Sequence, residues 1–187
     1  MLESNLYVAL IHFPVMNKKD QPIGSALTTI DLHDIARASI TFGVKGFYVV
    51  TPYVDQALIA TQVIEHWTKG VGGTLNPFRK KALELIQVTK TFEDAIALIE
   101  QERKEPVVTI ATSAKTSPGS ITTGAVRKKL ENKASHVLVF GTAWGLANEL
   151  IETCDFILDP ILGNTEYNHL SVRSAASIYL DRIINGR

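Results

Sequence analysis

The chain has 187 residues, of which 45% are apolar and 20% are charged, and its 19 basic residues balance its 19 acidic ones. This composition excludes fibrous and intrinsically disordered proteins, and it predicts a single domain over residues 1–187. No apolar run approaches the roughly 20 residues that span a bilayer, and the first residues lack the basic start and apolar core of a signal peptide. We therefore expect a cytoplasmic protein without membrane contact.

The balanced charge leaves no global field that would attract nucleic acid or anionic lipid, so any polyanion site must be local. Three basic clusters could form one, although short basic runs are also common on solvated helix surfaces. They are Lys18 with Lys19, Arg79 with Lys80 and Lys81, and Arg127 with Lys128 and Lys129. The single cysteine, Cys154, has no disulfide partner, and we interpret it as a small buried side chain.

Apolar runs of strand length alternate with helical periodicity along the chain, which is the pattern of an α/β fold with a mostly parallel sheet. The amino-terminal half predicts a strand over residues 6–11, an irregular stretch over 13–30 and a helix from Asp31, as N-cap, to Gly43. A strand over 46–50 and a helix over 55–69 follow.

The central part of the chain contains two helix starts. Asn76 and Pro77 match an N-cap and the first helical position, and the helix continues through Ile86. Thr91 with Asp94 resembles a capping box that starts a helix through Arg103. The remaining predicted elements are strands over 87–89, 106–112, 137–140 and 156–158 and helices over 123–131, 146–153 and 169–184.

The last predicted helix is apolar over most of its circumference, which predicts either a dimer contact or deep burial within one subunit. Its apolar residues are Leu170, Val172, Ala175, Ala176, Ile178, Tyr179, Leu180, Ile183 and Ile184.

Several common functional motifs are absent from the sequence. It contains no Walker A, GxGxxG, HExxH or GxSxG motif, and its five histidines have no metal-ligand spacing. We therefore predict no metal site. Glycine, proline and small polar residues instead follow the late strands, in segments 112–119, 141–145 and 159–164. Such loops at the carboxyl ends of parallel strands form either a small-ligand pocket or ordinary turns.

Three segments together resemble the SPOUT or α/β-knot methyltransferases, and most closely their SpoU-type branch. Residues 31–50 contain a helix with Arg37, then Phe42 and Gly43, then a strand. Residues 137–146 contain a strand, a glycine loop and a helix start, and residues 158–176 are similar to the closing segment that enters the last helix. The resemblance runs from about residue 31 to the carboxyl terminus. It implies a C-terminal trefoil knot, bound S-adenosylmethionine and a homodimer formed through the last helix.

The resemblance also implies which residues hold the cofactor, mainly through the backbone of three loops. They are Thr112, Ser113, Gly141, Thr142, Gly145, Leu158, Pro160, Ile161, Gly163 and Leu170. Arg37 matches the arginine that the branch uses, where a guanidinium could bind phosphate and stabilise developing negative charge.

The sequence departs from the branch at two motif positions. Ala143 and Trp144 stand where a glutamate is usual, and Ser171 and Arg173 stand where Asn and Ser are usual. We therefore assign Arg173 as a second catalytic candidate, although it could equally serve the dimer contact. Asp159, Tyr167, Asn168 and His169 are further candidates for a general base or for positioning the acceptor.

The function implied by the resemblance is methylation of tRNA or rRNA with S-adenosylmethionine as donor. The alternative is an S-adenosylmethionine-binding protein with a non-RNA acceptor or without catalysis, which the two departures favour. A nucleotide-binding α/β domain of another class is a third hypothesis, and the absence of Walker A and GxGxxG counts against it.

Overall fold

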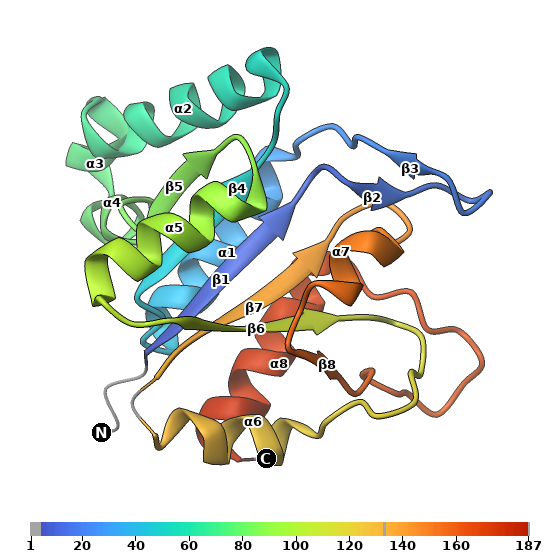
Figure 1. The fold of residues 1–187 in the computed structure, drawn as a ribbon. Helices are drawn as coiled ribbons and strands as arrows, with labels where there is room; N and C mark the ends of the chain where they lie inside the picture. Colours follow the sequence, from blue (N-terminus) through green and yellow to red (C-terminus); the bar gives the residue numbers. More distant parts are fainter. Residues whose placement is uncertain (1–4, 133, 187) are drawn as a thin grey trace.

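Six parallel strands form one sheet that helices cover on both faces in the computed structural model, which describes residues 5–132 and 134–186 (Figure 1). The predicted α/β class with a mostly parallel sheet is confirmed. The sheet contains β1 (Leu6–Ile11), β4 (Gly46–Val50), β5 (Ile86–Thr89), β6 (Val107–Thr112), β7 (Ser135–Gly141) and β8 (Phe156–Leu158). Their order across the sheet is β5–β4–β1–β7–β6–β8, so all carboxyl ends share one edge.

Two hydrophobic cores lie on opposite faces of the sheet, because side chains alternate along each strand. Leu6 and Val8 face the larger core, to which α1, α2, α4, α6 and α8 contribute. Tyr7 and Ala9 face the smaller core, which α5 and α7 cover. The helices are α1 (Thr29–Thr41), α2 (Val54–Thr68), α3 (Val71–Leu75), α4 (Pro77–Leu83), α5 (Phe92–Arg103), α6 (Thr123–Leu130), α7 (Asn148–Glu152) and α8 (Val172–Asn185).

The predicted strands are confirmed, three of them with the predicted bounds, because continuous apolar runs are typical of strands buried on both faces. Two helix starts are confirmed with their caps. The Asn76 side chain accepts a hydrogen bond from the Arg79 amide at 3.0 Å. Thr91 and Asp94 form the predicted capping box, each side chain accepting from the other's amide at 3.1 Å.

Three predicted helix ends were wrong by three residues. Thr28, and not Asp31, is the N-cap of α1. The last helix begins at Val172 with Ser171 as N-cap, because the Ser171 hydroxyl accepts from the Ser174 amide and the segment before it is not helical. The helix that starts at Pro77 ends at Leu83, because the chain must turn before β5 pairs with β4.

Two features were not predicted. The irregular stretch contains a small hairpin of β2 (Val15–Met16) and β3 (Pro22–Ile23), and the glycine-rich residues after α2 form the short helix α3. Two-residue strands are too short to show alternation, so no periodicity could have identified them.

The last helix, α8, buries much of its apolar surface within the subunit. Ala176, Tyr179, Leu180 and Ile183 lie in the larger core, and the other apolar residues of the helix are half-buried. Packing against α1 and α6 therefore accounts for most of its apolar circumference. Within the described residues, no helix is both long and apolar enough to cross a membrane.

Two histidines in strand-end positions are buried and change the response of the fold to acid. His136 is the second residue of β7 and has 2% of its surface exposed, and His12 follows β1 and is fully buried. Burial disfavours the charged imidazolium and lowers the pKa of each histidine below its usual value of 6.5. The unfolded chain therefore binds more protons than the native one below that pH.

We predict that the free energy of unfolding is flat above about pH 6.5 and falls as the pH drops below it, by at most about 1.4 kcal/mol per pH unit for each histidine. A His136→Gln variant should show a shallower slope, because it removes one of three histidines whose pKa burial lowers, the others being His12 and His33. Urea unfolding at pH 5 to 8 measures this. Identical slopes in variant and parent would contradict the assignment.

Candidate functional site

Three loops meet at the carboxyl edge of the sheet, because β7, β6 and β8 are neighbours there. The loop after β6 pairs with β8: the Ile121 amide donates to the Ile157 carbonyl at 2.8 Å, and the Asp159 amide donates to Ile121 at 2.9 Å. The Asn168 side chain, from the loop after β8, donates to the Ala114 carbonyl at 2.9 Å. The segments at 112–119, 141–145 and 159–164 therefore do come together.

A chain of hydrogen bonds fastens the glycine loop after β7 to the segment after β1. The Thr142 hydroxyl donates to the Ile11 carbonyl at 3.0 Å and also contacts the Ser25 hydroxyl. Ser25 in turn lies 3.0 Å from His12 Nδ1. His12 is buried with a lowered pKa, so it is neutral near pH 7 and positions Ser25 instead of carrying charge. Sequence reasoning missed His12 and Ser25, because neither has a motif around it.

The glycine loop is tightly folded on itself. A Cβ at Gly141 would lie 2.4 Å from the Leu146 amide nitrogen, so only glycine fits there. Ala143 has a φ of 51° and Gly145 a φ of 104°. The left-handed conformation costs a residue such as Ala143 about 1 kcal/mol. Hydrogen bonds from the Trp144 amide to the Met16 carbonyl and from the Met16 amide to the Gly145 carbonyl hold the loop in this shape.

The loop residues predicted to bind the cofactor present backbone more than side chains. The Thr112 hydroxyl donates to the Val139 carbonyl at 2.9 Å, and the Ser113 hydroxyl accepts from the Lys115 amide at 3.0 Å. Leu158 and Ile161 point their side chains into the core. Pro160 is half-buried, whereas Gly163 and Leu170 are exposed.

Two glycines of these loops expose their backbone. A Cβ built on Gly145 or Gly163 meets no atom within 4 Å, so bare backbone faces open space at both positions. Backbone amides and carbonyls that are free of side-chain cover suit a polar, planar ligand. Within the described residues, no group of three His, Cys, Asp or Glu side chains is placed to hold a metal ion.

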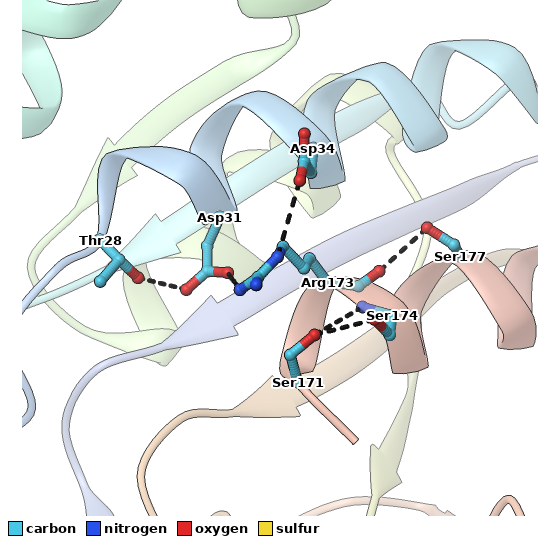
Figure 2. Close-up of polar contacts among 7 residues, drawn as sticks. All are labelled: Thr28, Asp31, Asp34, Ser171, Arg173, Ser174 and Ser177. Carbon is cyan, nitrogen blue, oxygen red and sulfur yellow. Dashed lines mark hydrogen bonds and ion pairs between the residues drawn. The ribbon is translucent and has the colours of Figure 1, made fainter.

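Arg173 joins the start of α8 to α1, as Figure 2 shows. Its Nη1 lies 3.1 Å from Asp31 Oδ1, and its Nε lies 3.6 Å from Asp34 Oδ2. The Asp31 side chain is only 9% exposed, and it also accepts a hydrogen bond from the Thr28 hydroxyl. Arg173 therefore neutralises a nearly buried carboxylate. A guanidinium has five N–H donors, so these two contacts leave Arg173 further donors.

Arg37 and Arg173 line the same open groove between α1 and α8, which has a volume of about 650 Å³. Asp34, Phe42 and Ile178 also line it. Arg37 is exposed and lies on α1, about 12 Å along the helix axis from its first residue. The structure thus brings the two predicted catalytic arginines together, but it places Arg37 on the helix groove and not on the three loops.

The other candidate polar residues are spread around the loops. Asp159 accepts from the Ser120 hydroxyl, and its carbonyl accepts from the Tyr179 hydroxyl at 2.8 Å. Burial raises the pKa of Tyr179 to about 12, so this hydroxyl stays protonated. Tyr167 and His169 are exposed rings in mutual contact. Burial also raises the pKa of Cys154 to about 11, which keeps its thiol unreactive.

Comparison with known proteins identifies the family to which this arrangement of loops and helices belongs. Residues 5–185 match the model of a family described as SAM-dependent RNA methyltransferase. The chain belongs to this family. The methyl donor of this family is S-adenosylmethionine. The matched residues include both the three loops and the α1–α8 groove. The predicted resemblance to RNA methyltransferases is therefore confirmed.

One relative carries a more specific name. The chain is 46% identical over 182 residues to a tRNA (guanine-N(1)-)-methyltransferase from Oleidesulfovibrio alaskensis, with 96% of this chain and 42% of that protein covered. The chain thus spans less than half the length of this relative. The activity in its name is that of the whole, longer protein.

Solved structures confirm the SPOUT fold. TrmJ from Z. mobilis ZM4 superposes with a TM-score of 0.60 at 14% identity, covering 97% of this chain and 69% of that one. The SpoU methyltransferase AviRb from Streptomyces viridochromogenes, in complex with the cofactor AdoMet, superposes with a TM-score of 0.56 at 14% identity, covering 100% of this chain and 59% of that one.

We predict that Arg173→Gln lowers the free energy of unfolding by about 1–3 kcal/mol, because it leaves the Asp31 carboxylate nearly buried without its cation. Arg37→Gln, in the same groove but exposed, should change it by about 0.5 kcal/mol or less. Urea unfolding compares the two. Equal effects would show that the ion pair does not stabilise the joint between α1 and α8.

Proposed function

We propose that this chain transfers a methyl group from S-adenosylmethionine to tRNA. The observation that carries the proposal is the set of three loops that leave one edge of the sheet, with bare backbone at Gly145 and Gly163, in a chain that belongs to an RNA methyltransferase family. The choice of tRNA over rRNA follows the name of the relative from Oleidesulfovibrio alaskensis. A cytoplasmic location would accompany an RNA acceptor.

The cofactor would lie against the three loops, held by backbone atoms at Thr112, Gly141 and Gly163 and by their neighbours in the predicted set. The side chains of Leu158 and Ile161 would serve it indirectly, because they anchor the third loop in the core. The trefoil knot is part of the same proposal. It is supported by the way Ile121, before α6, pairs along the outer side of β8 while the chain continues from Asp159 toward α8.

The methyl group of S-adenosylmethionine is bound to a positively charged sulfur, which makes its transfer favourable without covalent help from the protein. The protein must align the acceptor and stabilise charge that develops on it. We assign the second task to Arg37, whose exposed guanidinium can also bind an RNA phosphate. Arg173 is the second candidate for this task, because its contacts with Asp31 and Asp34 leave other N–H donors of the guanidinium unused. It also orients the start of α8.

A homodimer would bring Arg37 to the loops. Within one subunit Arg37 lies on the groove between α1 and α8, away from the loop residues in sequence and on a different element. The groove also presents the half-buried apolar side chains of Phe42 and Ile178. Packing of a second copy on this groove would cover these side chains and place Arg37 next to the partner's site.

We predict that Gly141→Ala weakens S-adenosylmethionine binding at least tenfold, because the added methyl group cannot fit beside the Leu146 amide without moving the loop. Gly124→Ala is the matched control, since its Cβ would make only an ordinary contact at 3.7 Å in α6. Isothermal titration calorimetry measures both. Unchanged affinity in Gly141→Ala would reject the glycine loop as part of the cofactor site.

We predict that Arg37→Ala lowers kcat for tRNA methylation about 100-fold or more, as loss of a charge-stabilising donor does, and leaves S-adenosylmethionine affinity within about twofold. Methyl transfer to unmodified tRNA transcripts, followed by nuclease digestion and mass spectrometry, measures the rate and identifies the methylated atom. Full activity would reject Arg37. If the parent protein binds the cofactor but methylates no RNA, the alternative holds: the chain binds S-adenosylmethionine without methylating RNA.

A further inference from the structure

Trp144 is a large exposed side chain on a loop whose backbone is held rigidly. The side chain of Trp144 is 56% exposed, although its amide donates to the Met16 carbonyl at 3.1 Å. The Met16 amide donates to Gly145 at 2.9 Å, and Ala143 is left-handed. The strained backbone and its hydrogen bonds to β2 therefore hold the indole in solvent. It gains little of the free energy that burial of apolar surface would give.

Two further rings extend this surface. The His169 ring lies 6.0 Å from Trp144 and 5.4 Å from Tyr167, measured between ring centroids. Tyr167 is 74% exposed. Tyr167 and His169 are two residues apart on the non-helical segment that precedes α8, so both can present their rings to the same side. We call Trp144, His169 and Tyr167 the aromatic row.

Basic side chains stand beside the aromatic row. The hairpin of β2 and β3, whose Met16 holds Trp144, carries the exposed Lys18 and Lys19 at its tip. Asp20 at the same tip lies 3.8 Å from the Lys115 ammonium in the loop after β6. Lys18, Lys19 and Lys115 stand here against Asp20 and the exposed Glu166 next to Tyr167, so this edge has an excess of one basic residue in a chain of zero net charge.

We propose that the aromatic row stacks an unpaired RNA base, with the lysines of the hairpin and of the β6 loop next to its phosphates. This inference rests on the proposed function and adds the binding site of the acceptor strand to it. Sequence-specific RNA recognition uses unpaired bases stacked on aromatic rings, and enzymes that modify a base must first take it out of its stack. Trp144 lies in the glycine loop itself, so a base stacked on it would lie at the edge of the cofactor site.

The positive edge favours RNA over a protein segment as the occupant, because stacking and phosphate contacts are combined in one place. The remaining competitor is the cofactor, whose adenine could also stack on Trp144, and the experiment separates the two.

The chain contains two tryptophans, Trp67 and Trp144, so a Trp67→Phe variant makes Trp144 the only indole reporter. We would titrate this variant, saturated with S-adenosylhomocysteine, with a single-stranded 12-nucleotide RNA of mixed sequence and with the corresponding paired duplex. Stacking predicts quenching of Trp144 emission by the single strand and little by the duplex. If Trp67→Phe folds poorly, the difference in emission between the parent and Trp144→Phe reports the same signal.

Kinetics with tRNA transcripts supply the second readout. Trp144→Leu should raise KM for tRNA about tenfold or more, since it removes a stacking ring, while Trp144→Phe should recover most of this loss. The affinity for S-adenosylmethionine should stay within about twofold in both variants.

Three results would overturn the inference. The single strand could bind, as measured by anisotropy of a labelled strand, without changing Trp144 emission. Trp144→Leu could methylate tRNA with the KM of the parent. The cofactor alone could quench Trp144 with no further change on adding RNA, which would assign the indole to the cofactor. Fluorescence and anisotropy need no turnover, so they test the aromatic row even if the parent protein transfers no methyl group and the proposed function fails.

Discussion

The parallel pairing of β7, β6 and β8 is the constraint on which the site depends. Because these strands are neighbours and run in one direction, the loops that follow them leave the same edge of the sheet. β8 has only three residues, and Ile121 extends its pairing on the outer side. The backbone hydrogen bonds at Ile157 and Asp159 thus lock the loop after β6 to the strand that precedes the third loop. Ligand contacts from three distant parts of the chain become possible only through this pairing.

The side chains of the three loops are used mainly to shape the loops. Side chains at Leu158 and Ile161 pack in the core, and the Thr112 hydroxyl bonds a neighbouring strand. Glycine is required at 141 by close approach of the chain, and the left-handed Ala143 turns the loop so that Trp144 stands outward. The side chains and the backbone hydrogen bonds within and between these segments therefore fix the shape of the loops.

The joint between α1 and α8 is the second structural unit of the molecule, and a nearly buried ion pair holds it. Arg173 and Asp31 are 142 residues apart in sequence, and the guanidinium also contacts Asp34 one turn further along α1. The joint sets the direction in which α8 leaves the third loop. It also forms one wall of the groove that contains Arg37, so stability and the proposed charge stabilisation share the same helix pair. A change at Arg173 therefore affects both, whereas Arg37 can be changed with little effect on the fold.

Local physical rules were sufficient for most of the secondary structure. The strands follow from continuous apolar runs, and the caps at Asn76 and Thr91 follow from side chains that bond amides three residues away. Thr28 was missed as a cap because its side chain makes no bond to an α1 amide, and the β2–β3 hairpin was missed because its strands have two residues each. The family resemblance, carried by the order of three motifs, pointed to the cofactor class.

By itself, the sequence determined the α/β class, the elements and the loops in which a ligand site would form, since each depends on residues close together in the chain. Only the tertiary structure decided which groups those loops and helices bring together. It joined Arg173 to Asp31, fastened Thr142 to Ser25 and His12, and set Trp144 beside His169 and Tyr167. These contacts join residues far apart in the sequence and depend on strand order and helix packing. They therefore cannot be predicted from any local pattern of residues.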